Sequence, residues 1–384
     1  MTPEPLNPFS MPLDGFRAAA VERGFGPGQA ERAYREVFRG GRLERVVTTQ
    51  LGSGGRGRAA IARASIAPIV REMAEAGDEG TTIKFVQRVG RGGARLESEH
   101  LDIESVIIPM VGMRGRRTHT LCVSSQVGCA MGCGFCETAQ MGLVRHLTAE
   151  EIVGQWFAAT HLKGARIDNI VFMGMGEPLD NAAEVLRAIS VLADHNGPAV
   201  PMANITISTV GRIDGLRMLD EVVKQRGWKR LGLAISINAP NDEIRSKIMP
   251  INRAMPMAEL REALLGFRRG SNRKLCFEYV LIPGVNDSAD NARELADYLA
   301  PFGPKDGRSA TGLVNVIPYN PRRDSPWPAP EEAQVDRFIG WLRDRGMFVK
   351  RRRTKGRDMM GACGQLGTAE IRGRRLVGAT IGAT

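Results

Sequence analysis

Residues 128–140 read GCAMGCGFCETAQ, and this stretch places Cys129, Cys133 and Cys136 in the spacing C-x₃-C-x₂-C. Three thiolates on one short loop can each bind a different iron of a [4Fe–4S] cube, which leaves the fourth iron without a protein ligand. Glycines within the stretch allow the tight loop that three converging ligands require. The spacing therefore predicts an iron–sulfur cluster with one open iron.

An open iron can bind the amino and carboxylate groups of S-adenosylmethionine (SAM) and pass an electron to its sulfonium. Cleavage then yields a 5′-deoxyadenosyl radical, which is chemistry that side chains alone do not perform. The alternative interpretation is a structural zinc site with His119 or Cys122 as the fourth ligand. Zinc sites usually contain a second ligand pair close by, and the sequence has none near this loop. We therefore favour the cluster.

Strand-like and helix-like segments alternate after the cysteine loop. A capping-box pattern, Thr148 with Glu151, marks the start of the first helix. Apolar, β-branched strands in repeated strand–helix units predict a parallel sheet buried on both faces. The fold expected is α/β, a partial parallel (β/α) barrel with its site at the carboxyl ends of the strands. The expected strands are residues 169–174, 204–210, 231–237, 275–282 and 313–319, and the expected helices include 148–162, 181–192 and 257–267.

The chain divides into three parts on the same grounds. Residues 1–80 carry amphipathic patterns and predict a small helical accessory domain. Residues 81–350 hold the barrel, preceded by short strands. Residues 351–384 are basic and glycine-rich, so we expect a C-terminal loop.

Polar side chains and glycines recur where the expected strands end. In the run VFMGMGEP, residues 171–178, Gly176 lets the backbone approach a ligand, and Glu177 can accept a hydrogen bond from the SAM ammonium group. Hydroxyl and amide groups at neighbouring strand ends suit ribose and carboxylate recognition. Taken singly, each is typical of an ordinary turn or helix cap. The predicted SAM-binding residues are Gly176, Glu177, Ser208, Ser236, Ile237, Asn238 and Asn320.

Charge and composition narrow the partners and the location. The chain has 53 Lys and Arg against 42 Asp and Glu, a formal net charge of +11. This excess favours a polyanionic partner such as a nucleic acid, although a solvated arginine-rich surface gives the same count. No apolar run approaches the ~18 to 20 residues that cross a bilayer, and the N-terminus lacks the order of a secretory signal. We therefore expect a cytoplasmic protein with no membrane partner.

Seven short stretches on either side of and beyond the cysteine loop complete a family signature. Together with the loop, they make residues from about 100 to about 368 resemble the RlmN/Cfr family of radical SAM RNA methyltransferases. The resemblance implies an enzyme that uses one [4Fe–4S] cluster and two SAM molecules per turnover to methylate a ring carbon of adenosine, carbon 2 in preference to carbon 8. The implied substrate is 23S rRNA and, for some members, tRNA. The stretches are LCVSSQ (121–126), MGMGEPL (173–179), ISTVG (207–211), AISINAPNDEIR (234–245), VLIPGVND (280–287), IPYNP (317–321) and GACGQL (361–366).

The resemblance also implies roles for three residues. Cys363 takes a methyl group from the first SAM, and the radical from the second SAM abstracts hydrogen from that methyl. The carbon radical adds to adenine, Glu104 removes the ring proton, and Cys122 resolves the crosslink and is left in a disulfide with Cys363. A thiolate at Cys122 near an electropositive loop would serve the last step. We interpret Cys276 as a core cysteine, and we expect a monomer that receives electrons from a reductant such as flavodoxin.

A basic segment precedes Cys363. Residues 350–353, Lys355 and Arg357 predict a platform that binds RNA phosphates, with the target base extruded into the barrel. Two other functions stay open. A radical SAM enzyme with a diverged RNA or non-RNA substrate would keep the three cluster cysteines and tolerate loss of Cys363, and a non-catalytic RNA-binding protein would contain zinc.

Two positions depart from the family pattern. Asn238 stands where the family has a histidine, so this position can form hydrogen bonds to SAM but cannot titrate. Glu137 replaces a small residue directly after the cysteine loop. Its negative charge beside the cluster is expected to lower the reduction potential.

Overall fold

A single large sheet organises the protein. The structure, a computed structural model, describes residues 4–50, 56–91, 101–112, 115–270, 275–304 and 310–367, which include a ten-stranded sheet of order β14-β13-β12-β11-β10-β9-β6-β5-β4-β3. One part of the sheet is parallel: β6 (Arg117–Cys122), β9 (Asn169–Phe172), β10 (Ile205–Thr209), β11 (Gly232–Ser236), β12 (Leu275–Leu281), β13 (Gly312–Pro318) and β14 (Val349–Arg351). The other part is antiparallel: β5 (Leu101–Val111), β4 (Gly80–Val89) and β3 (Ile69–Gly77).

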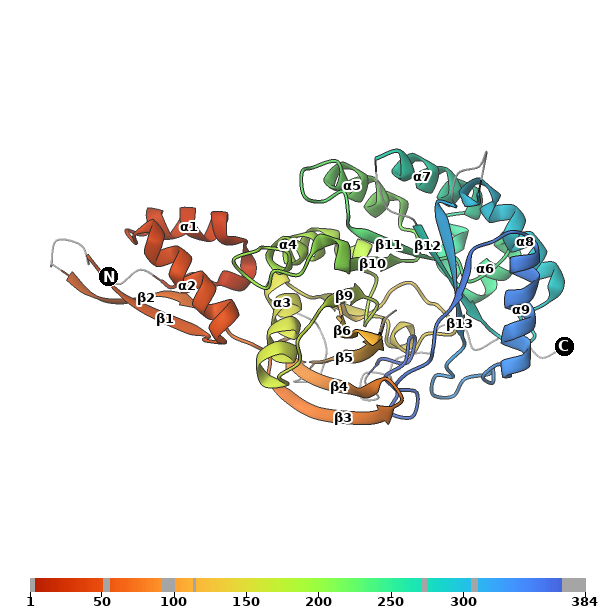
Figure 1. Ribbon diagram of the computed structural model, residues 1–384, viewed down its shortest axis with the longest axis horizontal. Helices are drawn as coiled ribbons and strands as arrows, with labels where there is room; N and C mark the ends of the chain where they lie inside the picture. Colours follow the sequence, from red (N-terminus) through yellow and green to blue (C-terminus); the bar gives the residue numbers. More distant parts are fainter. Residues whose placement is uncertain are drawn as a thin grey trace.

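Helices connect the parallel strands and cover the outside of the curved sheet (Figure 1). Along β12, Phe277 and Tyr279 are 1% exposed and pack outward, Tyr279 against Phe338 of α9 at a ring distance of 5.1 Å. Cys276 and Glu278, on the opposite face of the same strand, line cavities inside the curve. The sheet ends at β14 and β3, so the predicted partial barrel is confirmed. The helices are α3 (Ala149–Phe157), α4 (Ala182–Leu192), α5 (Ile213–Val223), α6 (Asp242–Ile248), α7 (Met257–Gly270), α8 (Ala289–Leu299) and α9 (Glu332–Asp344).

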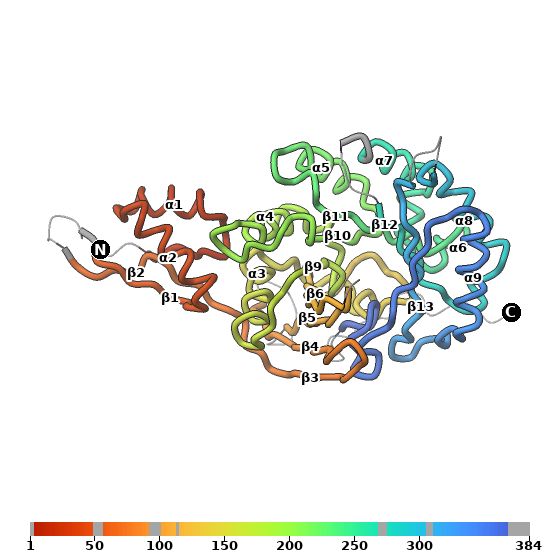
Figure 2. Tube along the Cα trace, in the orientation of Figure 1, coloured from red at the N-terminus to blue at the C-terminus, as the bar shows by residue number. Residues whose placement is uncertain are grey.

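The C-terminal segment, residues 352–367, links the two ends of this open sheet. It leaves β14 at one end and returns past β4 and β5, as the blue tube of Figure 2 shows. The Gly356 N–H donates to Glu75 of β3 at 3.0 Å, and Lys84 of β4 donates to the Met360 carbonyl at 3.0 Å. The segment therefore lies across the mouth of the partial barrel and brings Cys363 inside. Residues 368–384 of the expected C-terminal loop lie outside the described residues.

The N-terminal part differs from its expected helical structure. Helices α1 (Leu13–Glu22) and α2 (Pro27–Gly40) are followed by a hairpin, β1 (Glu44–Gln50) and β2 (Arg56–Arg63), and then by β3 of the large sheet. The helical expectation is therefore wrong for residues 44–50, 56–63 and 69–77, which form strands. The β-branched run VVTT of β1 itself favours a strand. In β3, which reads IVREMAEAG, pairing with β4 outweighs the helix-favouring residues. The division of the chain into domains stays a prediction.

The N-terminal unit, which consists of α1, α2, the β1–β2 hairpin and the residues before α1, packs on the barrel through aromatic side chains. Phe9 is fully buried, and its ring lies 5.3 Å from that of Phe157 at the end of α3. The Leu13 N–H donates to the Asp194 carboxylate after α4 at 2.6 Å. These contacts fix the unit at the far end of the molecule from α9 (Figure 1). In the part of the chain that the structure describes, every helix is too short or too polar to cross a membrane.

Candidate active site

A short hairpin holds the cysteine loop. Strand β7 (Gln126–Gly128) pairs with β8 (Leu143–His146), and the loop between them carries the three cysteines. Gly128 has φ +75°, and a Cβ atom there would lie 1.8 Å from the Gly142 carbonyl oxygen. Only glycine therefore fits at this turn. Farther along the loop, the Gly134 N–H donates to the Ile248 carbonyl at 2.9 Å.

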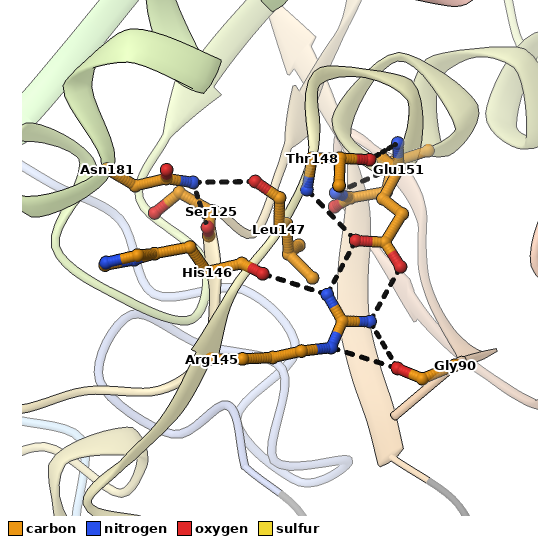
Figure 3. Close-up of polar contacts among 9 residues, drawn as sticks. Gly90, Ser125, Arg145, His146, Leu147, Thr148, Glu151 and Asn181 are labelled. Carbon is orange, nitrogen blue, oxygen red and sulfur yellow. Dashed lines mark hydrogen bonds and ion pairs between the residues drawn. The ribbon is translucent and has the colours of Figure 1, made fainter. Parts of the chain in front are cut away.

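Side-chain contacts tie the hairpin to the barrel (Figure 3). Arg145 of β8 donates to both carboxylate oxygens of Glu151 at 2.7 and 2.8 Å. The predicted capping box at Thr148 and Glu151 is confirmed, with bonds of 3.3 and 3.0 Å. Asn181 donates to the carbonyls of Ser125 and Leu147 at 2.9 and 2.8 Å, one on each side of the hairpin. The hairpin is thus fixed to α3 and α4.

One cavity gathers most of the predicted residues. It is lined by Cys129, Cys133, Cys136, Gly176, Glu177, Ser208, Ser236, Asn238, Asn320 and Cys363. Ile237 is fully buried, and it contributes through its backbone, where its N–H donates to the Glu278 carbonyl at 3.0 Å. Apart from the cysteine loop and Cys363, the residues named above come from the carboxyl ends of β9, β10, β11 and β13, which is the predicted edge of the sheet.

The three thiols suit a cluster better than a single ion. All are free, and they line the same cavity. Burial, and then the neighbouring thiolate of Cys136, raises the pKa of Cys133, so positively charged iron would be needed to hold both sulfurs ionised. Among the described residues, no three His, Cys, Asp or Glu side chains are arranged around one metal ion. A cube, in which each thiolate binds a different iron, does not require such an arrangement. His119, the suggested zinc ligand, contacts the Arg166 carbonyl instead.

Glu177 is a buried residue of the cavity wall. Its carboxylate accepts from the backbone N–H groups of Leu179 at 3.0 Å and Val210 at 2.9 Å. Burial raises its pKa to about 7. Gly176, at φ +103°, leaves room for Gln126, whose side chain accepts from the Glu177 N–H at 2.8 Å. Glu177 therefore braces the ends of β9 and β10, and it lines the cavity where an ammonium group of SAM would bind.

A buried acid that sequence reasoning missed connects Ser208 to the C-terminal segment. Glu278 accepts from the Ser208 hydroxyl at 2.9 Å and from the Arg352 guanidinium at 3.2 Å. Arg352 also contacts the Met173 sulfur at 3.2 Å. A carboxylate within the otherwise apolar strand LCFEYVLI was the signal for Glu278, because a buried charge needs a partner.

Asn238 and Asn320 hold backbone as well as lining the cavity. Asn238 has φ +54°, a conformation that asparagine tolerates better than most residues, and its side chain accepts from the Val280 N–H at 2.9 Å. Asn320 donates to the Cys363 carbonyl at 3.3 Å and accepts from Arg357 at 3.1 Å. Asn320 thereby positions the GACGQL loop.

The same neighbouring charge, that of Arg352, acts on the thiols of both Cys122 and Cys363. Burial, and then the negative charge of a Cys363 thiolate, raises the pKa of Cys122 to about 12. Burial likewise raises the pKa of Cys363 to about 11. The Arg352 cation lowers both pKa values. Both thiols are therefore mostly protonated near neutral pH, unlike the ionised Cys122 that was expected, and Arg352 is the group that favours their ionisation.

Glu104 lies apart from the described lining of this cavity. It is 1% exposed, and it forms an ion pair with Lys84 at 3.2 Å. Its other oxygen accepts from the Gly367 N–H at 3.0 Å, four residues after Cys363. Burial raises the pKa of Glu104, and the Lys84 charge opposes that rise. Its role as a base stays a prediction.

The structure corrects two expectations about the C-terminal half. Arg352 is not part of an exposed platform, because it points inward to Glu278. Its neighbours are paired, Arg351 with Glu332 and Arg353 with Glu79 at 2.8 Å. Cys276 is not a core cysteine, since it lines a second cavity inside the barrel together with Cys363. Both errors arise because the sequence does not say which side chains the fold directs into the barrel interior.

Comparisons with known proteins agree with this geometry. Residues 123–296 match the Radical SAM superfamily. The chain is 42% identical over 278 residues to the probable dual-specificity RNA methyltransferase RlmN 1 of Protochlamydia amoebophila, covering 72% of this chain and 73% of that protein. The chain belongs to the RlmN family of radical SAM RNA methyltransferases. A second RlmN protein, from Syntrophotalea carbinolica, is 40% identical over 304 residues, covering 79% of this chain and 74% of its own length.

The same relationship holds in three dimensions. The crystal structure of a radical SAM methyltransferase from Sphaerobacter thermophilus superposes with a TM-score of 0.77 and 33% identity, covering 95% of this chain and 99% of that one. The superposition includes the N-terminal unit as well as the barrel, given this coverage. RlmN membership implies one [4Fe–4S] cluster and SAM as cofactors, in agreement with the cavity described above.

Proposed function

We propose that this protein methylates a ring carbon of adenosine, carbon 2, in 23S rRNA and tRNA, and that it does so through an S-methylcysteine at Cys363. The observation that carries the proposal is a single cavity lined by the three cysteines of the C-x₃-C-x₂-C loop and by Cys363. Curated relatives at about 40% identity carry the name dual-specificity RNA methyltransferase.

The residues of the cavity have separate roles in the proposed reaction. Cys129, Cys133 and Cys136 would hold the cluster, which when bound supplies the electron that cleaves SAM. Gly176, Glu177, Ser208, Ser236, Ile237, Asn238 and Asn320 form the SAM site. Asn320 holds the backbone of Cys363, so the sulfur faces the cavity from the C-terminal segment.

Cys363 acts first, as the thiolate that accepts a methyl group from the SAM sulfonium. Arg352 favours that thiolate, since it lowers the pKa of Cys363. Cys122 acts last, when its sulfur displaces the methylated base from Cys363 and forms the disulfide. For Glu104 to remove the ring proton, its bond with the Gly367 N–H has to open, which requires the loop after Cys363 to move when RNA binds.

We also propose that a flavodoxin-like reductant supplies the electron and that the protein acts as a monomer in the cytoplasm. The positive net charge of +11 suits the RNA partner.

The experiment is nucleoside mass spectrometry. Cluster-loaded enzyme is incubated with a reductant, methyl-labelled SAM and either a 23S rRNA fragment or tRNA that lacks the modification. We expect labelled 2-methyladenosine from wild type and none from Cys363→Ala, while Cys122→Ala leaves RNA covalently attached to the protein. Cleavage of SAM without methylation of either RNA would contradict the proposal and favour a diverged substrate.

A further inference from the structure

A second cavity continues from the first toward the amino ends of the parallel strands. The two share residues at their junction, among them Cys363, Glu278 and Asn320. The deeper cavity is lined by one inward residue from each strand of the row: Thr120, Val171, Thr206, Ala234, Cys276 and Asn315. Cys363 is therefore accessible from two sides, from the cysteine loop on one side and from this cavity on the other.

The side-chain amide of Asn315 is a polar group in the lining of the second cavity that is open to a ligand. Its backbone pairs with Glu278 of β12 and with Lys350 of β14 in register. Within the described residues its side-chain amide has no hydrogen-bond partner, and it is half-buried in the cavity lining. Glu278 beside it is already paired with Ser208 and Arg352. The Asn315 amide thus offers its NH₂ donors and its carbonyl acceptor to a ligand.

The rim of the second cavity carries cations. Lys350 is exposed, and its side chain has no ion-pair partner among the described residues. Arg353 is also at the rim, with 79% of its side chain exposed, although it contacts Glu79. Inside the cavity the charge of Glu278 is balanced by Arg352. At the rim the single carboxylate of Glu79 faces both Arg353 and Lys355, so the rim keeps a net positive charge. A charge-balanced interior behind a positive rim suits a base on a phosphate backbone, since the phosphates meet the cations while the base enters.

We propose that this second cavity receives the target adenine, which reaches Cys363 from the side opposite the cluster, and that Asn315 recognises its 6-amino edge. The inference rests on the proposed function and adds the substrate-binding site to it. SAM and the cluster would fill the first cavity, so a second substrate needs another approach to Cys363. An asparagine amide can accept from an adenine amino group and donate to a ring nitrogen, a pairing that discriminates adenine from other bases.

The test separates methyl loading from methyl transfer. Full-length, cluster-loaded wild type and Asn315→Ala are given RNA with adenosine or purine riboside, which lacks the 6-amino group, at the target position. Labelling of Cys363 by methyl-labelled SAM is measured without RNA and is expected to be unchanged in the variant. We expect wild type to prefer adenosine over purine riboside about 10- to 100-fold in kcat/KM and the variant to lose most of that preference. The matched control is Asn291→Ala, on the outer helix α8.

A variant that keeps the full preference for adenosine would overturn the inference, and so would a wild type that accepts both bases equally. If Asn315→Ala fails to fold, which lost Cys363 labelling would reveal, the surface variant Lys350→Met carries the test. It should load Cys363 normally but bind RNA more weakly and with a shallower salt dependence than Lys229→Met, and equal binding by the two would contradict the site. An unlabelled Cys363 in wild type would instead contradict the proposed function.

Discussion

Removing the Arg352 guanidinium should slow methyl loading of Cys363. Arg352 contacts Glu278 and Met173, and its charge lowers the pKa of Cys363, which burial raises to about 11. At pH 8 a thiol with that pKa is ionised to roughly one part in a thousand. Loss of an opposite charge at close range raises a pKa by about one unit or more, so Arg352→Met should lower the thiolate fraction, and with it the loading rate, about tenfold.

The assay is the initial rate of Cys363 labelling by methyl-labelled SAM, measured against pH in cluster-loaded enzyme without RNA. Because only the thiolate reacts, the rate should rise with pH in both proteins and stay about tenfold lower in Arg352→Met at every pH below 11. Arg351→Met is the matched control, since that side chain pairs with Glu332 and Asp336 on α9. An Arg352→Met rate equal to that of the control would refute the reasoning.

A purely structural effect of the same substitution has a different signature. Glu278 would be left buried without its cation, which costs stability. The double variant Arg352→Met/Glu278→Gln removes that penalty and should regain thermal stability relative to the single variant. Its loading rate should stay below that of wild type, and a double variant that loads at the wild-type rate would assign Arg352 to folding alone.

Three further predictions concern the scaffold. The pKa of Glu177 is raised to about 7, so the folded apoprotein favours the protonated carboxyl, and its free energy of unfolding should fall as pH rises from 4.5 through 7. Glu177→Gln should flatten this pH dependence in chemical denaturation, and an unchanged slope would contradict the assignment. Phe9→Ala should cost about 3–5 kcal/mol of stability in urea unfolding because the ring is fully buried, whereas Val21→Ala, at a side chain 48% exposed, should cost little; equal effects would disprove the docking of the N-terminal unit. Gly128→Ala should abolish cluster binding, measured as iron content and visible absorbance, while Gly266→Ala, which has open space around it, should bind a full cluster; a loaded Gly128→Ala protein would show that the turn is not required.

The parts of the site that sequence predicted are those with a local signature. The spacing of Cys129, Cys133 and Cys136 identifies a ligand loop within eight residues, and the strand ends that carry Glu177 and Ser208 follow from alternation of strands and helices. Parallel strands align their carboxyl ends, so residues from separate motifs meet without any further information. The gathering of these residues in one cavity follows from that rule.

The parts that sequence could not predict depend on which face of an element meets which partner. Arg352 stands between two basic residues that form surface ion pairs, and only the fold directs it inward to Glu278. Asn315 lies in an apolar strand, and its open amide is visible only when the neighbouring strands are in place. Strand β3 was missed because its pairing with β4 outweighs its helix-favouring residues.

The most direct test of the central claim is peptide mass spectrometry of Cys363. Cluster-loaded protein is incubated anaerobically with methyl-labelled SAM and no RNA, and the peptide that contains GACGQL is analysed. The account predicts one labelled methyl group on Cys363 and none on Cys122 or Cys276. An unlabelled Cys363 in protein that holds a cluster and cleaves SAM would contradict the methyl-carrier function of this cavity.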